Sequence, residues 1–367
     1  MAQDSKAKYW HKLTDGKIQC DLCPRLCKLA AGQSGYCTFR RSDGDELFAL
    51  TFGLSSGFCV DPIEKKPLFH FLPGSAVLSF GTVGCNLGCR GCQNWDLSRC
   101  AIKDAELSKA PPDRIARSAQ ELGCASVAFT YNEPIIFHEY AVETAKECRA
   151  RGIKTVAVTA GYVMPKPREE FYQYMDAANV DLKGFTEEFY KKYTDAELGP
   201  VLETLEYIKH KTSTWLEITT LVIPGMNDSD RDITNMTSWI AKNLGPEVPL
   251  HFSAFYPAHK MLDRPYTPPE TLEKARKIAL HHGLSHVYTG NIRSPKSQST
   301  YCRFCGKMLI GRNGFAVTGW HLKEGGHCES CNAVCAGVFE AKPGMWGSKR
   351  QQVRLRPDRD FHPENLT

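Results

Sequence analysis

The chain has 367 residues, of which 42% are apolar and 24% charged, and its formal net charge is +5. These proportions are those of an ordinary globular protein, and so small a charge gives no reason to expect nucleic-acid binding. No apolar run reaches the ~18 residues of a membrane helix, and the polar residues 1–12 do not resemble a signal peptide. We therefore expect a cytoplasmic protein with no membrane span.

The cysteines are numerous and clustered. A count of 16 is high for a chain in the reducing cytosol, where thiols serve metal binding or catalysis rather than disulfides. Three groups stand out: Cys20, Cys23, Cys27 and Cys37; Cys85, Cys89 and Cys92; and Cys302, Cys305, Cys328, Cys331 and Cys335. The other cysteines are expected to be small buried hydrophobes.

The first predicted unit is a cysteine-rich arm over residues 1–74. It contains the four thiols of the first group, Cys20, Cys23, Cys27 and Cys37. Four thiolates can bind zinc or an iron–sulfur cluster, and a Cys-Pro step such as the one here occurs in ferredoxin-type sites. The spacing does not decide which metal binds or what the metal does. The metal would either fold the arm or deliver electrons to a redox centre elsewhere in the chain.

Strand and helix patterns then alternate six times within a predicted core of residues 75–292. The predicted strands cover residues 77–83, 126–131, 154–161, 179–184, 215–223 and 250–256. The predicted helices cover residues 112–123, 135–152, 166–177, parts of 186–211, 229–245 and 269–283. Six consecutive βα units predict an α/β fold, either a partial TIM barrel or an open doubly wound sheet. In both, the chemistry lies at the carboxyl ends of the strands.

The central cysteines directly follow the first predicted strand. Cys85, Cys89 and Cys92 therefore lie in the first βα loop, at the edge where chemistry is expected. Three thiolates can hold a 4Fe–4S cluster with one iron left open, and an open position is typical of a catalytic metal site. A zinc loop is the alternative, but zinc would need a fourth ligand from elsewhere.

This CxxxCxxC loop resembles that of the radical S-adenosylmethionine (SAM) superfamily. The resemblance implies that the open iron of a 4Fe–4S cluster on Cys85, Cys89 and Cys92 binds SAM. The reduced cluster would cleave SAM to methionine and a 5′-deoxyadenosyl radical, which makes the chain a radical SAM oxidoreductase. Members commonly carry an aromatic residue before the third cysteine, where Gly91 stands here. Packing for the adenine would then come from elsewhere, such as Trp95.

Further positions at strand ends resemble SAM-binding residues of the superfamily. Glu133 matches the acidic residue of a Gly-Gly-Glu motif that holds the SAM amino group. Equally, Asn132 or Glu133 could be the N-cap of a helix that begins at Pro134. Asp181 and Lys183 share one strand face and resemble the Asp-Leu-Lys of glycyl-radical activating enzymes, although a surface salt bridge is the alternative. Thr159 ends the third strand, where those enzymes carry Asp-Thr-Asn-Gly and Val158 here replaces the aspartate.

The third cysteine group predicts a zinc-ribbon or rubredoxin-like unit over residues 293–341. Its ligands would be two CxxC pairs: Cys302 with Cys305, and Cys328 with Cys331. A unit this small usually needs a metal to fold. Zinc is expected because it is redox-silent and common, and iron is the alternative. Residues 342–367 are polar, with no apolar pattern, and predict a disordered tail.

Motifs along most of the chain resemble the radical SAM enzyme of the AmmeMemoRadiSam system. They include Cys20-Asp-Leu-Cys23-Pro, Asp61-Pro-Ile-Glu-Lys-Lys-Pro-Leu68, His70-Phe-Leu-Pro-Gly74 and Cys92-Gln-Asn-Trp95. The resemblance implies Memo-like and AMMECR-type partners, a flavodoxin- or ferredoxin-type electron donor, and hydrogen abstraction from an unidentified substrate. Two alternatives stay open: an activating enzyme for a pyruvate formate-lyase-like glycyl-radical enzyme, and a non-enzymatic zinc- or iron-binding scaffold.

Overall fold

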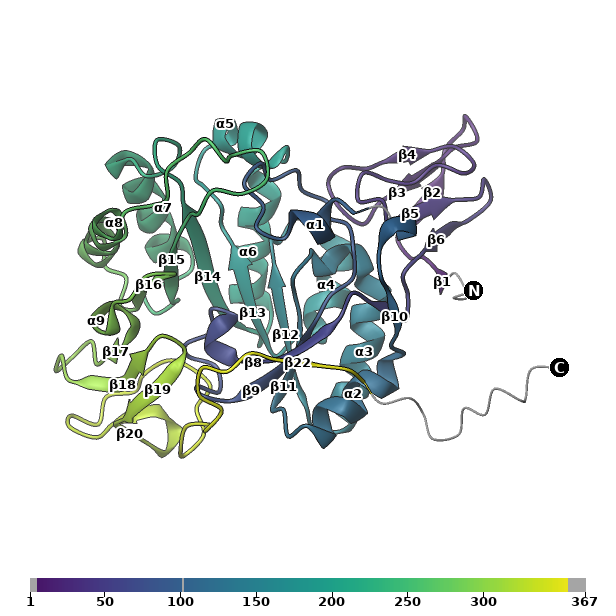
Figure 1. Ribbon diagram of the computed structural model, residues 1–367. Coiled ribbons are helices and arrows are strands. Elements are labelled where there is room, and N and C mark those ends of the chain that lie inside the picture. The colour runs from purple at the N-terminus through teal and green to yellow at the C-terminus, as the bar shows by residue number, and fades with distance from the viewer. Residues whose placement is uncertain (1–4, 101, 356–367) are drawn as a thin grey trace.

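A nine-stranded sheet forms the centre of the protein (Figure 1). The computed structural model describes residues 5–100 and 102–355. The strand order is β16-β15-β14-β13-β12-β11-β9-β8-β22. Seven neighbouring strands are parallel: β9 (Ala76–Phe80), β11 (Ser126–Phe129), β12 (Lys154–Thr159), β13 (Ala177–Asp181), β14 (Trp215–Val222), β15 (Leu250–Ala254) and β16 (Val287–Gly290).

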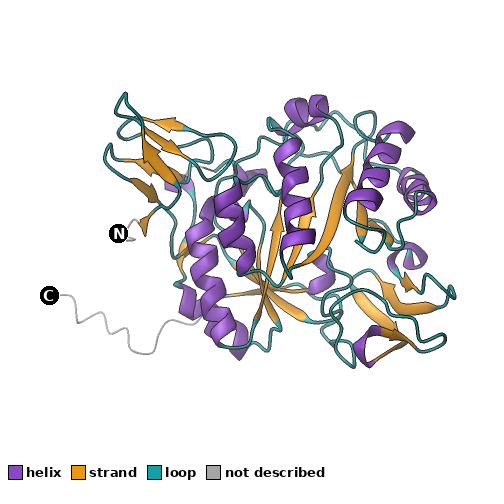
Figure 2. Ribbon diagram, turned by 180° about the vertical axis from the view of Figure 1, so that it is seen from behind, coloured by secondary structure: helices purple, strands orange, loops and turns teal. Residues whose placement is uncertain are grey.

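Helices alternate with these strands and lie in front of the sheet in Figure 2. They are α2 (Pro112–Glu121), α3 (His138–Ala150), α4 (Pro165–Gln173), α6 (Gly199–Lys211), α7 (Asp230–Asn243) and α8 (Pro269–His281). Each buries an apolar stripe; in α2, Ile115, Ala116 and Ala119 are buried at helical spacing. The six predicted βα units are therefore present, and the predicted α/β core is confirmed.

The two edge strands of the sheet, β16 and β22, do not pair with each other, so hydrogen bonds do not close the sheet into a barrel. The partial TIM barrel stays a prediction. The predicted strands do not include β16, although its first three residues are buried. Its position is fixed by pairing with β15, where Leu250 lies opposite Val287. No helix in the described ranges is both long and apolar enough to cross a membrane.

Two antiparallel strands extend the sheet beyond β9 and change the predicted boundaries. Strand β8 (Phe58–Pro62) lies within the predicted arm of residues 1–74, yet it pairs with β9. Strand β22 (Gln351–Val353) pairs with β8, so the prediction of disorder is wrong for this part of the tail. Backbone hydrogen bonds to a free sheet edge hold this polar segment without an apolar side-chain pattern. Residues 356–367 lie outside the described part of the chain.

The two ends of the chain form small units of their own. In the N-terminal arm, β1 (Ser5–Lys6), β5 (Arg40–Ser42) and β6 (Leu47–Ala49) form one sheet, and β2 (Trp10–Lys12), β3 (Ile18–Cys20) and β4 (Lys28–Leu29) form another. Near the C-terminus, β17 (Thr300–Tyr301), β18 (Met308–Asn313) and β19 (Ala316–Trp320) form a third, followed by the pair β20 (Leu322–Lys323) and β21 (His327–Cys328). Strands β18 and β19 form an antiparallel hairpin between the two CxxC pairs.

The buried carboxylate of Glu217 on β14 connects the sheet to the loop before β9. It accepts hydrogen bonds from the backbone N–H groups of Phe69 and His70 at 3.0 and 2.7 Å. The ring Nε1 of Trp215 and the ring Nε2 of His251 also lie at hydrogen-bond distance, 3.0 and 2.7 Å. Because a buried carboxylate without partners is costly, these contacts fix the loop against β14 and β15.

Replacing Glu217 should test this connection. Glu217→Ala leaves several buried donors without an acceptor, so we expect the free energy of unfolding to fall by about 3–5 kcal/mol. The control is Glu329→Ala, which removes a half-exposed partner of His321 and should change stability by less than about 0.5 kcal/mol. Denaturant unfolding of both variants measures the difference, and equal effects would contradict the assigned role.

Candidate active site

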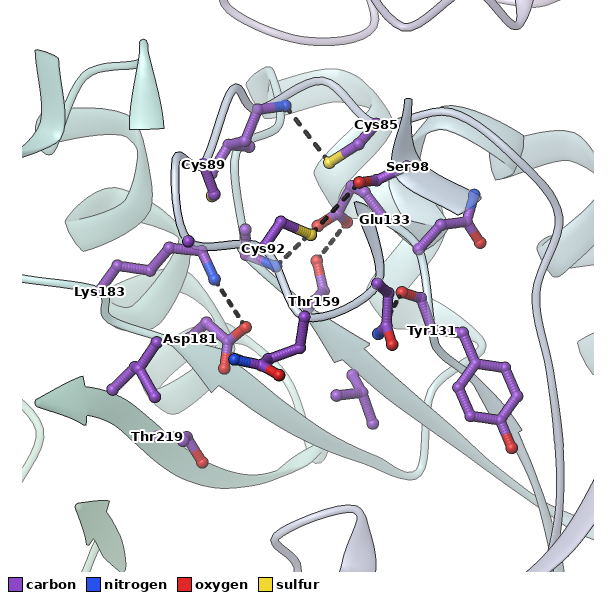
Figure 3. A pocket seen from close by; sticks show the side chains of 18 of the residues that line it. Cys85, Cys89, Cys92, Ser98, Tyr131, Glu133, Thr159, Asp181, Lys183 and Thr219 are labelled. Atoms are coloured by element: carbon purple, nitrogen blue, oxygen red, sulfur yellow. Dashed lines mark hydrogen bonds and ion pairs between the residues drawn. The ribbon is translucent and has the colours of Figure 1, made fainter. Parts of the chain in front are cut away.

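The three central cysteines line one cavity at the carboxyl edge of the sheet (Figure 3). Cys85, Cys89 and Cys92 lie in the loop between β9 and the short helix α1 (Trp95–Ser98). Four other predicted site residues line the same cavity: Glu133, Thr159, Asp181 and Lys183. The cavity measures about 280 Å³, near the lower end of the ~300–1,000 Å³ typical of small-molecule sites.

The side chain of Asn132 positions the start of this cysteine loop. Its Oδ1 accepts a hydrogen bond from the backbone N–H of Thr82 at 2.9 Å. Its Nδ2 donates to the carbonyl of Gly84 at 3.0 Å and to Thr82 Oγ1 at 3.2 Å. The end of β11 therefore sets where the loop leaves β9, and with it the place of Cys85. Asn132 is one of the two predicted N-cap residues, but Glu133 caps the helix, and Asn132 fixes the loop instead.

The sulfur atoms suit a metal cluster with an open position. Burial raises the pKa of the Cys85 thiol, with a further contribution from Glu133, and burial raises that of Cys89 to about 11. Buried thiols of this kind become thiolates when they bind a metal. The three sulfurs do not all lie within 4.8 Å of one another, so the group is wider than a single-ion site. No fourth cysteine is among the described residues that line the cavity.

Glu133 is held rigidly between two strand ends. Its carboxylate accepts hydrogen bonds from Thr159 Oγ1 at 2.5 Å, from the backbone N–H of Ala160 at 2.7 Å and from that of Ile135 at 3.1 Å. Burial raises the pKa of Glu133, although these hydrogen bonds act in the opposite direction. The expected N-cap role is confirmed by the bond to Ile135, and the same carboxylate lines the cavity.

Asp181 and Lys183 form an ion pair at the end of β13, with 2.9 Å between Oδ2 and Nζ. Both side chains are partly buried and line the cavity, so the pair is not a freely solvated surface bridge. Burial by itself lowers the pKa of Lys183, but Asp181 and Cys89 together act in the opposite direction and hold the pKa well above its usual value. The cavity therefore contains a fixed ammonium group near Cys89.

Trp95 does not reach the cavity. Its ring is 49% exposed and stacks on His259, with 5.5 Å between the ring centroids. The rings of Phe255 and Tyr193 fill the space beside Gly91, where other members carry an aromatic residue. A Cβ on Gly91 would lie 2.8 Å from Phe255 Cε2 and 3.2 Å from Tyr193 Oη. Tyr193 lines the cavity. These two rings come from distant segments, and no motif pointed to them.

A second cavity, of about 730 Å³, adjoins the first along β15, and Ser253 lines both. Phe315, in the turn between β18 and β19, contributes to its wall. Glu64 also lines it, and its buried Oε2 has no hydrogen-bond partner among the described residues. Arg293 is exposed at the same cavity and makes no ion pair with the described part of the chain. None of these four residues has a role predicted from the sequence.

The C-terminal cysteines form a compact four-sulfur group, as predicted. Cys302 and Cys331 have 3.5 Å between their sulfurs, and Cys305 and Cys328 have 3.8 Å. Ligands bound at 2.3 Å around a tetrahedral metal are ~3.8 Å apart, so the spacing fits one zinc or iron ion. A hydrogen bond from the backbone of Cys331 is the largest cause that lowers the pKa of Cys328, to about 6.

The N-terminal cysteines also come together. Cys20, Cys23, Cys27 and Cys37 line one narrow cavity between the arm and the core. Asn86 of the central loop and Ile136 contribute to its wall. Unlike the C-terminal group, these sulfurs do not all lie within 4.8 Å of one another. The predicted four-thiol site is therefore present as a group of neighbouring side chains.

Comparison with known proteins identifies the family. A family model described as Radical SAM superfamily matches residues 80–236, which include the cysteine loop and the ends of β11 to β13. The uncharacterized protein MJ0808 of Methanocaldococcus jannaschii is 39% identical over 307 residues, covering 84% of this chain and 91% of that protein. The chain belongs to the radical SAM superfamily.

Other relatives are activating enzymes. The 4-hydroxyphenylacetate decarboxylase activating enzyme of Clostridium scatologenes is 31% identical over 127 residues, 34% of this chain and 40% of that enzyme. The (2S)-3-sulfopropanediol dehydratase activating enzyme of Klebsiella oxytoca is 28% identical over 123 residues, 33% and 38% of the two chains. The chain thus spans less than two thirds of these enzymes. A radical SAM methyltransferase structure from Sphaerobacter thermophilus matches 65% of this chain and 71% of its own, at 14% identity and a TM-score of 0.46.

The close packing at Gly91 gives a prediction. Gly91→Ala places a methyl group against Phe255, a buried ring, and should lower the free energy of unfolding by about 1–3 kcal/mol. The double variant Gly91→Ala/Phe255→Leu should recover part of that loss. Gly199→Ala is the control, because a Cβ there meets nothing within 4 Å. Denaturant unfolding tests the set, and a Gly91→Ala variant as stable as the parent would refute the contact.

Proposed function

We propose that the chain is a radical SAM enzyme that works at the Cys85, Cys89 and Cys92 cavity. When bound there, a 4Fe–4S cluster supplies the electron that cleaves SAM to methionine and a 5′-deoxyadenosyl radical. The observation that carries the proposal is a cavity with three thiols and no fourth among its described lining residues. This donor set leaves one position open for a second ligand.

The surrounding side chains would bind and orient SAM. Glu133, fixed by three hydrogen bonds, is placed to accept a hydrogen bond from an ammonium group. Thr159 keeps that carboxylate in position. The Asp181–Lys183 pair offers one acceptor and one donor at the opposite wall. Trp95 would act only at the rim, since it does not line the cavity.

We infer that the substrate enters through the second cavity, which meets the first at Ser253. Hydrogen abstraction needs the substrate beside the radical and away from water. Glu64 Oε2 lacks a partner among the described residues and would accept a hydrogen bond from a hydroxyl or amine. Arg293 would attract an anionic group. The substrate itself is unidentified.

The motifs of residues 20–27, 61–74 and 92–95 support assignment to the AmmeMemoRadiSam system. Under this proposal the protein is cytoplasmic and works with Memo-like and AMMECR-type proteins. Its electrons come from a flavodoxin- or ferredoxin-type donor. The C-terminal group Cys302, Cys305, Cys328 and Cys331 holds zinc, which stabilises the wall that carries Phe315.

A second candidate function is activation of a glycyl-radical enzyme. The observation that favours it is the identity of 25–31% with activating enzymes for decarboxylases and related lyases. The substrate would then be a protein backbone, which must reach the cavity as an extended segment. A glycyl-radical enzyme encoded beside the gene would favour this function, and Memo-like neighbours would disfavour it. A scaffold without activity would need no open cluster position.

The proposal is tested by anaerobic reconstitution with iron and sulfide, followed by SAM and dithionite. Wild type should form 5′-deoxyadenosine, and the Cys85, Cys89 and Cys92 to Ala triple variant should fall to background. Cys124→Ala is the matched control, since this buried cysteine lies away from all three groups and should leave product formation intact. Wild type with an intact cluster and no product would support the scaffold alternative.

A further inference from the structure

One of the four N-terminal sulfurs accepts a hydrogen bond from the backbone. Cys27 Sγ accepts a hydrogen bond from the backbone N–H of Tyr36 at 3.4 Å. Amide donors aimed at sulfur are the outer contacts that tune metal–thiolate sites. The backbone N–H of Tyr36 is therefore placed to donate to a metal-bound sulfur of Cys27.

The spacing of the sulfurs distinguishes this group from the C-terminal one. The C-terminal sulfurs all lie within 4.8 Å of one another, as a single tetrahedral ion requires. The N-terminal sulfurs form no such set, although they line a common cavity. The sulfurs of Cys85, Cys89 and Cys92 also line a common cavity without all lying within 4.8 Å of one another. A cluster of four irons needs wider spacing than one ion, so sulfurs that do not all lie within 4.8 Å of one another fit a cluster better than a single ion.

A buried cation faces the same cavity with unused donors. Arg40 is 1% exposed, and its Nη2 donates to Lys8 O at 2.5 Å and to Glu139 Oε1 at 2.7 Å. Its Nε and Nη1 find no acceptor within the described ranges. Unpaired guanidinium N–H groups at a buried site are costly unless a ligand accepts from them. Thiolates and sulfides of an anionic cluster would be such acceptors.

The N-terminal group also touches the central loop. A Cβ on Gly84, which precedes Cys85, would lie 2.2 Å from the backbone oxygen of Cys37, so the two backbones are in contact. Asn86, which follows Cys85, lines the N-terminal cavity. Arg25 Nε donates to the carbonyl of Asn86 at 2.5 Å. The ligand loops of the two sites are therefore packed directly against each other.

We propose that Cys20, Cys23, Cys27 and Cys37 hold a 4Fe–4S cluster that relays electrons to the central site. An external one-electron donor is oxidised as the N-terminal cluster is reduced, and that electron then passes to the cluster on Cys85, Cys89 and Cys92. Arg40 donates to the sulfurs of the relay cluster. The relay step rests on the proposed function, whereas metal binding at the N-terminal group does not.

The identity of the cluster is tested in the full-length triple variant of Cys85, Cys89 and Cys92 to Ala, purified anaerobically and reconstituted. We expect about four irons and four sulfides per chain, and an electron paramagnetic resonance signal after dithionite. Wild type should bind about eight irons. Two zinc ions and no iron in the variant would overturn the proposal. If the variant fails to fold, the wild-type count decides: about eight irons support the proposal and about four overturn it.

The relay is tested by reducing wild type, removing excess dithionite and adding SAM. The N-terminal signal should decay in wild type and persist in the triple variant, which lacks the electron acceptor. A signal that persists in wild type while 5′-deoxyadenosine forms would overturn the relay. Wild type that forms no 5′-deoxyadenosine would overturn the proposed function and the relay with it, while the iron count still decides the cluster. Arg40→Lys, which keeps the charge but loses donors, should lower the midpoint potential of this cluster.

Discussion

The site depends on the hydrogen bonds by which Asn132 holds the start of the cysteine loop. Its side chain bonds Thr82 and Gly84, immediately before Cys85, from the end of the neighbouring strand. Parallel strands bring their carboxyl ends to one edge, so this contact places the loop beside Glu133 and the strand ends that follow. The place of the cysteine loop beside the rigid Glu133 carboxylate follows from that constraint.

Much of this arrangement could be predicted from the sequence. Strands such as β12 and β14 are long and rich in β-branched residues, and their order along the chain predicts parallel neighbours. The cysteine loop, Glu133 and Lys183 follow strands directly, so their convergence could be predicted too. Residues that act by packing across the fold could not: Tyr193 and Phe255 fill the space beside Gly91 from segments with no local signal.

Strand β22 could not be predicted, because its pairing partner rather than a side-chain pattern determines it. Its three residues are polar or half-buried, and they pair with the free edge of β8. Strand β16 differs, because its first three residues are buried and two of them are β-branched. Arg40 was missed because its partner Glu139 is 99 residues away. Trp95, chosen from its place next to the loop, stacks on His259 instead.

The central claim is that SAM binds directly to a cluster on Cys85, Cys89 and Cys92. The most direct measurement is electron–nuclear double resonance of the reduced protein with SAM labelled with ¹⁵N at its amino group and ¹⁷O at its carboxylate. The account predicts hyperfine coupling of both labels to the cluster in wild type and none in the triple variant. Tightly bound SAM without coupling to an intact cluster would contradict it.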